Sequence, residues 1–138
     1  MIPHAMLLRK KQTLRIGNRD AVRHHISLGP NESVVIKAGD NYATELEAND
    51  NSPIGVSCQH PWFRSHVLVL DHPYMAISDE NGRFAINDIP SGRWSVRVWH
   101  ESVGDLNFED WPQGELEINR PTIDMGELTA DLRVDTRD

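Results

Sequence analysis

Short runs in which apolar and polar residues alternate are the feature that most limits how this 138-residue chain can fold. In the clearest run, residues 93–100, Trp94, Val96, Val98 and His100 lie on one face. A repeat of two is that of a β-strand, and no stretch shows the three-and-four spacing of a long amphipathic helix. Turn residues interrupt the runs about every ten residues. The pattern predicts an all-β protein, an antiparallel Greek-key β-sandwich.

The expected strands cover residues 12–16, 24–28, 33–37, 42–46, 54–58, 66–70, 74–78, 83–86, 93–100, 115–118 and 127–134. Between two of these runs, the Asn81–Gly82 pair is the strongest hairpin signal in the sequence. Residues 103–114 are irregular, and the charged residues 135–138 are expected to fray.

Size and charge exclude several classes of protein. The chain is large enough to bury a core without disulfides, and its single cysteine rules out an internal disulfide framework. A formal net charge of -7 argues against binding to nucleic acid or to an anionic membrane surface. No apolar run reaches the length of a membrane span, and no signal peptide is visible. The protein is therefore either cytoplasmic or begins inside a longer precursor, and the abrupt start at Ile2-Pro3-His4 favours the precursor.

Three residues with metal-binding side chains fall on inward-facing strand positions. If residues 54–60 form a strand, Cys58 and His60 share the face of Ile54 and Val56, and His24 shares the face of Ile26 and Leu28. Two imidazoles and one thiolate are the ligands of a trigonal copper site for electron transfer. The alternative is that Cys58 acts as a small buried hydrophobe and that His60 ends its strand.

The first half of the chain resembles a cupredoxin. Residues 14–24 are similar to the cupredoxin stretch in which a strand, an Asn-x-Asp turn (Asn18 to Asp20) and a ligand histidine (His24) follow one another. Cys58 followed by His60 resembles the second ligand loop. The resemblance implies a copper site formed by His24, Cys58 and His60, with zinc as a further possibility. It also implies an unknown redox or structural protein partner.

The second half resembles a carboxypeptidase regulatory-like domain of the transthyretin-like type. The similar segments are Asp71-His-Pro-Tyr74, residues 78–84, Ile89-Pro-Ser-Gly92 and Val98-Trp-His-Glu101. The combination is similar to bacterial extracytoplasmic proteins that join the two modules, so it implies a periplasmic or secreted location. It also implies two halves. The cupredoxin-like half covers residues 1–71 and lacks its N-terminal strand. The regulatory-like half covers residues 72–134 and is either packed on the first half or continuous with it.

The sequence departs from the cupredoxin pattern in the second ligand loop. One residue, Gln59, separates Cys58 from His60 where the family has two, and Phe63 stands where the family has an axial methionine. His4 or a water molecule is the expected substitute for that thioether. The alternative to electron transfer is a metal-free interaction or structural module.

The other histidines favour structural roles, and no motif indicates an enzyme. We expect His72 to order a turn through a backbone hydrogen bond and His100 to be a satisfied histidine at the core edge. Were the two to meet, they could form a separate zinc site. The chain has no nucleophile motif, no phosphate-binding glycine loop and no helical zinc motif.

Overall fold

The computed structural model of the protein describes residues 3–48, 52–60, 62–106 and 115–129. The chain divides into two compact units, Met1–Asn87 and Asp88–Asp138, whereas the sequence placed the division after Asp71. In the described residues every regular element is a β-strand, which confirms the all-β prediction. The same residues form no helix that is long and apolar enough to cross a membrane.

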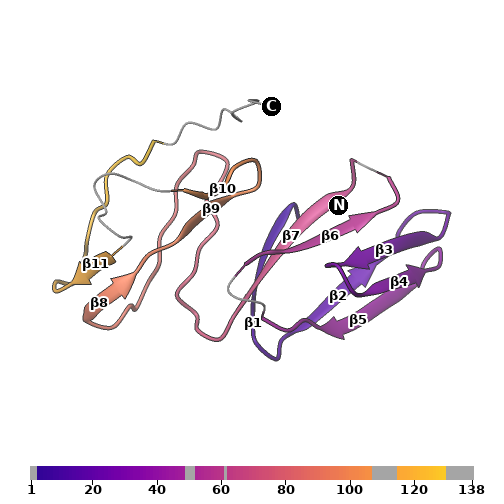
Figure 1. The fold of residues 1–138 in the computed structure, drawn as a ribbon, viewed down its shortest axis with the longest axis horizontal. Coiled ribbons are helices and arrows are strands. Elements are labelled where there is room, and N and C mark those ends of the chain that lie inside the picture. The colour runs from indigo at the N-terminus through magenta and orange to yellow at the C-terminus, as the bar shows by residue number, and fades with distance from the viewer. Residues whose placement is uncertain (1–2, 49–51, 61, 107–114, 130–138) are drawn as a thin grey trace. The chain divides into compact units, whose positions relative to one another are not determined.

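The first unit contains two sheets (Figure 1). The larger sheet has five strands in the order β1-β7-β6-β3-β4, and the smaller one pairs β2 with β5. The strands are β1 (Ala5–Arg9), β2 (Thr13–Gly17), β3 (His24–Leu28), β4 (Ser33–Ile36), β5 (Asn41–Glu45), β6 (Ile54–Cys58) and β7 (Arg64–Leu70).

Strand β1 corrects the prediction of a wholly antiparallel fold. It pairs with β7 in parallel, with Ala5 opposite His66 and Arg9 opposite Leu70. Alternation does not predict this strand, because four of its five residues are half-buried and the run Ala5–Leu8 is apolar throughout. A strand covered on both faces loses the alternation by which strands are recognised.

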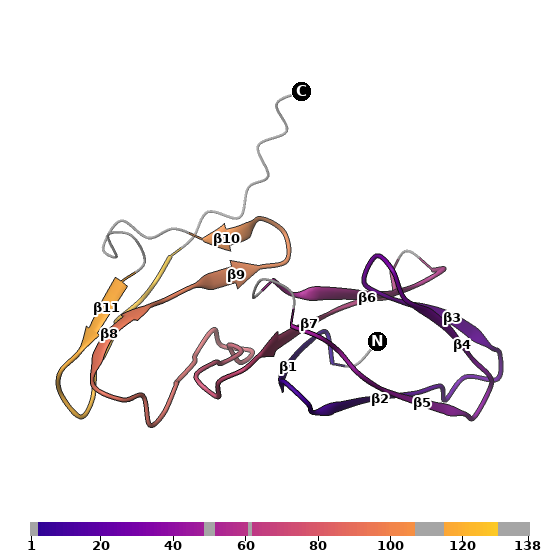
Figure 2. The same cartoon turned by 60° about the horizontal axis from the view of Figure 1, so that its bottom comes forward.

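The hydrophobic core lies between the two sheets, in a sandwich-like arrangement that Figure 2 shows edge-on. Leu14 of β2 packs from one side, and Ile26, Val56 and Val67 pack from the other. Val56 is the most deeply buried large side chain, with 2% of its surface exposed. The complete buried cluster comprises Leu14, Ile26, Leu28, Ile36, Leu46, Val56, Val67 and Val69.

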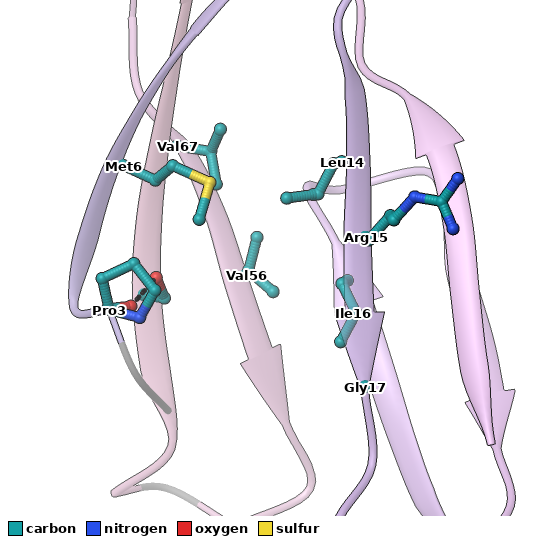
Figure 3. A pocket seen from close by; sticks show the side chains of 9 residues that line it. Pro3, Met6, Leu14, Arg15, Ile16, Gly17, Val56 and Val67 are labelled. Carbon is teal, nitrogen blue, oxygen red and sulfur yellow. Dashed lines mark hydrogen bonds between the residues drawn. The ribbon is translucent and has the colours of Figure 1, made fainter.

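A cavity of about 100 Å³ lies between the layers beside β1 and β2. Met6, Val56 and Val67 line one wall, and Leu14 and Ile16 face them from β2 (Figure 3). Its lining is mostly apolar, and it contains no cluster of metal-binding side chains. The cavity therefore belongs to the packing of the core, and its lining does not include His24, Cys58 or His60.

The second unit is built from two strand pairs. β8 (Gly92–Ser95) pairs with β11 (Glu115–Ile118), and β9 (Val98–His100) pairs with β10 (Gly104–Leu106), all antiparallel. The single strand predicted over residues 93–100 is therefore two strands, because its two ends have different partners. β10 falls in the stretch that the sequence analysis described as irregular.

An ion pair ties the β9–β10 hairpin together. The Arg97 guanidinium donates to both carboxylate oxygens of Asp105, with 2.9 Å between Nη2 and Oδ2. These hydrogen bonds, with the attraction between the charges, hold the pKa of Asp105 below its usual range and raise the pKa of Arg97. Both groups are well exposed, so the pair fixes geometry more than it adds stability.

Two predicted strands, and the described part of a third, are irregular. The turn around Asn81–Gly82 forms, with the Asp79 N–H donating to the Arg83 carbonyl over 2.9 Å, but residues 74–78 and 83–86 on its two sides are not strands. Ile77 and Phe84 on these segments are 47% and 46% exposed, so the hairpin lacks a packed face. Residues 127–129 of the predicted last strand are irregular, while 130–134 and the tail 135–138 lie outside the described residues.

Candidate metal centre

The pairing of β3 with β6 brings His24 beside Cys58. These strands are antiparallel neighbours, with Ile26 opposite Cys58 and Leu28 opposite Val56. His24 begins β3, on the same face as the buried Ile26, and is itself only 8% exposed. As a result its Nδ1 atom lies 3.6 Å from Cys58 Sγ.

His60 reaches the same place from a loop. β6 ends at Cys58, so the expectation that the strand continues to His60 is wrong. Backbone hydrogen bonds bend the chain here: the Phe63 N–H donates to the His60 carbonyl (3.0 Å), and the Cys58 N–H donates to the Phe63 carbonyl (3.3 Å). The ligand atoms of His24, Cys58 and His60 all lie within 4.8 Å of one another.

The backbone also contributes to the environment of the sulfur. The His60 N–H points at Cys58 Sγ, with 3.5 Å between the nitrogen and the sulfur. The contact places a hydrogen-bond donor against the sulfur, which is the atom that cysteine would offer to a metal. The thiolate is the form of cysteine that binds metals.

Asp20 determines which nitrogen of His24 faces the sulfur. Its Oδ2 atom lies 2.6 Å from His24 Nε2. A carboxylate can only accept a hydrogen bond, so Nε2 carries the proton and the lone pair of neutral His24 is on Nδ1, toward Cys58. A carboxylate behind a histidine in this way is the usual second partner of a metal-binding imidazole, since it fixes the orientation of the ring.

Asn18 in turn holds the loop that carries Asp20. The Asn18 side chain is almost fully buried, and its Nδ2 lies 2.7 Å from the Val22 carbonyl oxygen and 3.0 Å from that of Ile36. Its Oδ1 accepts a hydrogen bond from the Asp20 N–H over 3.0 Å. The amide therefore joins the loop before β3 to the end of β4 and sets the position of the carboxylate.

Two aromatic rings cover the imidazoles. Phe63 is stacked on His24, with ring centroids 5.9 Å apart and an angle of 9° between the planes. Trp62 is stacked on His60, with centroids 5.0 Å apart, and is itself 78% exposed. Phe63 therefore contributes an apolar wall beside the imidazole of His24.

The separation of the donors fits a shared ion. A thiolate sulfur about 2.3 Å and an imidazole nitrogen about 2.0 Å from one ion lie about 3.5–3.7 Å apart at tetrahedral or trigonal angles. The distance from Cys58 Sγ to His24 Nδ1, 3.6 Å, falls in this range. The ligand nitrogen of His60 lies within 4.8 Å of both other donors.

The remaining histidines lie elsewhere. His4, the proposed substitute for the axial ligand, is beside His66 and is not among the three grouped donors. The Tyr74 N–H donates to Nδ1 of His72, as expected for a turn-ordering histidine, and the Ser102 N–H donates to Nδ1 of His100. Among the described residues, neither His72 nor His100 belongs to a group of three or more potential ligands.

Comparison with known proteins adds no assignment: no protein-family model matches the chain, and no curated protein or solved structure is significantly similar to it. The site must therefore be judged on its own geometry. The strand phases predict its three donors, and the resemblance places Asn18 and Asp20 in a turn before His24, but neither indicates the hydrogen bond between Asp20 and His24 or the stacking of Phe63. The available signal was the four-residue separation of Asp20 from His24. In one extended strand these side chains would lie too far apart to touch, so their contact requires a loop between them.

Removal of the Asn18 amide should loosen this part of the molecule. In Asn18→Ala the carbonyls of Val22 and Ile36 lose a donor, and we expect a loss of about 2–3 kcal/mol in the free energy of unfolding. Urea denaturation followed by circular dichroism measures it. Asn31→Ala, at an exposed turn, is the matched control and should change stability by less than about 0.5 kcal/mol. Equal effects of the two substitutions would contradict the role given to Asn18.

Proposed function

We propose that the protein is a cupredoxin-like, Greek-key electron-transfer protein that holds one copper ion through His24, Cys58 and His60. The observation that carries the proposal is the grouping of these donors within 4.8 Å, with Asp20 behind His24. When bound, copper would supply a one-electron couple. The extracytoplasmic location and the redox partner follow from the resemblance of the sequence and are part of the same proposal.

The donor set favours copper over harder ions. A thiolate with two imidazoles suits Cu(I) and Cu(II), and also Zn(II), whereas Mg(II) and Ca(II) prefer oxygen. Cys58 and His60 are partly exposed and His24 is buried, so the ion can enter from the side of the loop. Phe63 and the core residues beside Cys58 limit the access of water on the inner side. Such shielding is one of the means by which a protein sets the potential of a copper centre.

A metal-free structural module is the second candidate, and a specific observation supports it. Among the described residues, every buried side-chain nitrogen and oxygen has a hydrogen-bond partner. His24 is already engaged by Asp20 and Cys58, so the fold does not require an ion to satisfy its polar groups. Zinc would use the same three donors, and elemental analysis of the protein as isolated distinguishes it from copper.

Titration with Cu(II) separates these possibilities. We expect one equivalent to produce an intense visible absorption from thiolate-to-copper charge transfer, because Cys58 supplies the only sulfur of the three donors. The band should disappear in Cys58→Ala. His25→Asn is the matched control: it changes the neighbouring histidine, which is exposed on the opposite face of β3, and should leave the band unchanged. If the unmodified protein shows no such band, the copper proposal fails and the metal-free module remains.

The Asp20 carboxylate should strengthen metal binding without touching the ion. In Asp20→Ala the His24 ring loses the acceptor that fixes its Nε2 proton, and we expect copper affinity to fall by about 10–100-fold. A competition titration with a chelator measures the affinity, and the electron paramagnetic resonance spectrum should change as well. Asp40→Ala removes the same charge from an exposed position nearby and should have little effect. Equal losses in both variants would show that Asp20 acts only through its charge.

A further inference from the structure

We propose that the imidazoles of His4 and His66 form a second metal site, which takes a first-row divalent ion such as Ni(II) or Zn(II). The two histidines lie in the first unit and are separate from His24, Cys58 and His60. The inference does not depend on copper binding at those three residues.

The parallel pairing of β1 with β7 fixes the two histidines side by side. The His66 N–H donates to the His4 carbonyl over 2.9 Å, which continues the ladder just before β1. The neighbouring Ser65 hydroxyl donates to the Pro3 carbonyl over 2.8 Å. Two hydrogen bonds therefore tie the segment that carries His4 to β7, although the two histidines are far apart in the sequence.

The rings are close enough to share an ion. Their centroids are 6.1 Å apart with an angle of 76° between the planes, and ligand nitrogens of the two rings lie within 4.8 Å of each other. Two imidazole nitrogens bound to one ion at 2.0–2.1 Å are about 3 Å apart. The shift that a shared ion would require falls to the exposed side chain of His4, since His66 is half-buried.

The chemistry of the pair differs from that of the first site. Imidazole ligands suit Zn(II), Cu(II) and Ni(II), and without a thiolate the pair has no preference for Cu(I). His66 is half-buried and His4 is exposed, so water can fill the other coordination positions. We therefore expect an exchangeable site, weaker than one with three protein ligands.

Metal binding at this site should stabilise the fold. Only the folded chain holds both histidines together, so an ion that binds them favours the folded state by mass action. Binding should therefore raise the melting temperature, and the rise should depend on the pairing of β1 with β7. Binding through His4 and its neighbours in the sequence, without His66, would give no such dependence.

Ni(II) titration of the full chain tests the proposal. The background is Cys58→Ala/His60→Asn, which removes the thiolate and the loop imidazole of the first site. We expect one Ni(II) to bind by calorimetry and the melting temperature to rise. Adding His66→Asn should weaken binding by at least about tenfold and abolish the thermal shift. His25→Asn, also on the surface of this unit, should change neither.

The outcomes are distinct. Ni(II) binding that survives His66→Asn would show that His66 is not a ligand and would overturn the proposal. An absence of binding in the background protein would overturn it as well. Since His66 is partly buried, His4→Asn provides a second variant at an exposed position, and it should lose binding with an unchanged circular dichroism spectrum. If this proposal fails, the copper proposal still stands, because the visible copper band depends on the sulfur of Cys58 and not on His4 or His66.

Discussion

The register between β3 and β6 is the constraint on which the candidate metal centre depends. Leu28 lies opposite Val56, and both are buried in the core, at 4% and 2% exposure. A slip of β6 by one residue would turn Val56 toward solvent while Leu28 stayed in the core, so hydrophobic burial strongly specifies this pairing. The same pairing places Ile26 opposite Cys58 and His24 beside it. The core therefore fixes the position of the polar donors, although it contributes none of them.

A chain of hydrogen bonds through Asn18 and Asp20 orients the imidazole of His24. Asn18 holds the loop, the loop presents Asp20, and Asp20 fixes the proton of His24 so that its free nitrogen faces Cys58. Each of these contacts lies partly or wholly out of water, where hydrogen bonds are stronger and unpaired groups are costly. The result is one imidazole and one sulfur that hydrogen bonds orient, with a third donor, His60, on a loop. Such a division suits a site that must admit an ion and then hold it.

Alternation made the strands that carry His24 and Cys58 predictable, because both are covered on one face and open on the other. It could not reveal β1, whose apolar run has no polar face, and therefore could not reveal the parallel pairing that joins His4 to His66. His60 does lie near Cys58, but not because the strand continues to it. Backbone hydrogen bonds to Phe63 bend a loop at residues where the alternation predicts a strand. The hairpin around Asn81–Gly82 shows the opposite failure, since local turn chemistry was right but the flanking segments had no surface to pack on.

X-ray absorption spectroscopy of the copper-loaded protein tests the central claim, that one ion is held by a thiolate and two imidazoles. The account predicts one sulfur at about 2.2–2.3 Å and two histidine nitrogens at about 2.0 Å from the metal, with the sulfur absent in Cys58→Ala. A first shell of nitrogen and oxygen alone in the unmodified protein would contradict it. In that case copper would bind at surface histidines, and the grouping of His24, Cys58 and His60 would be a feature of packing.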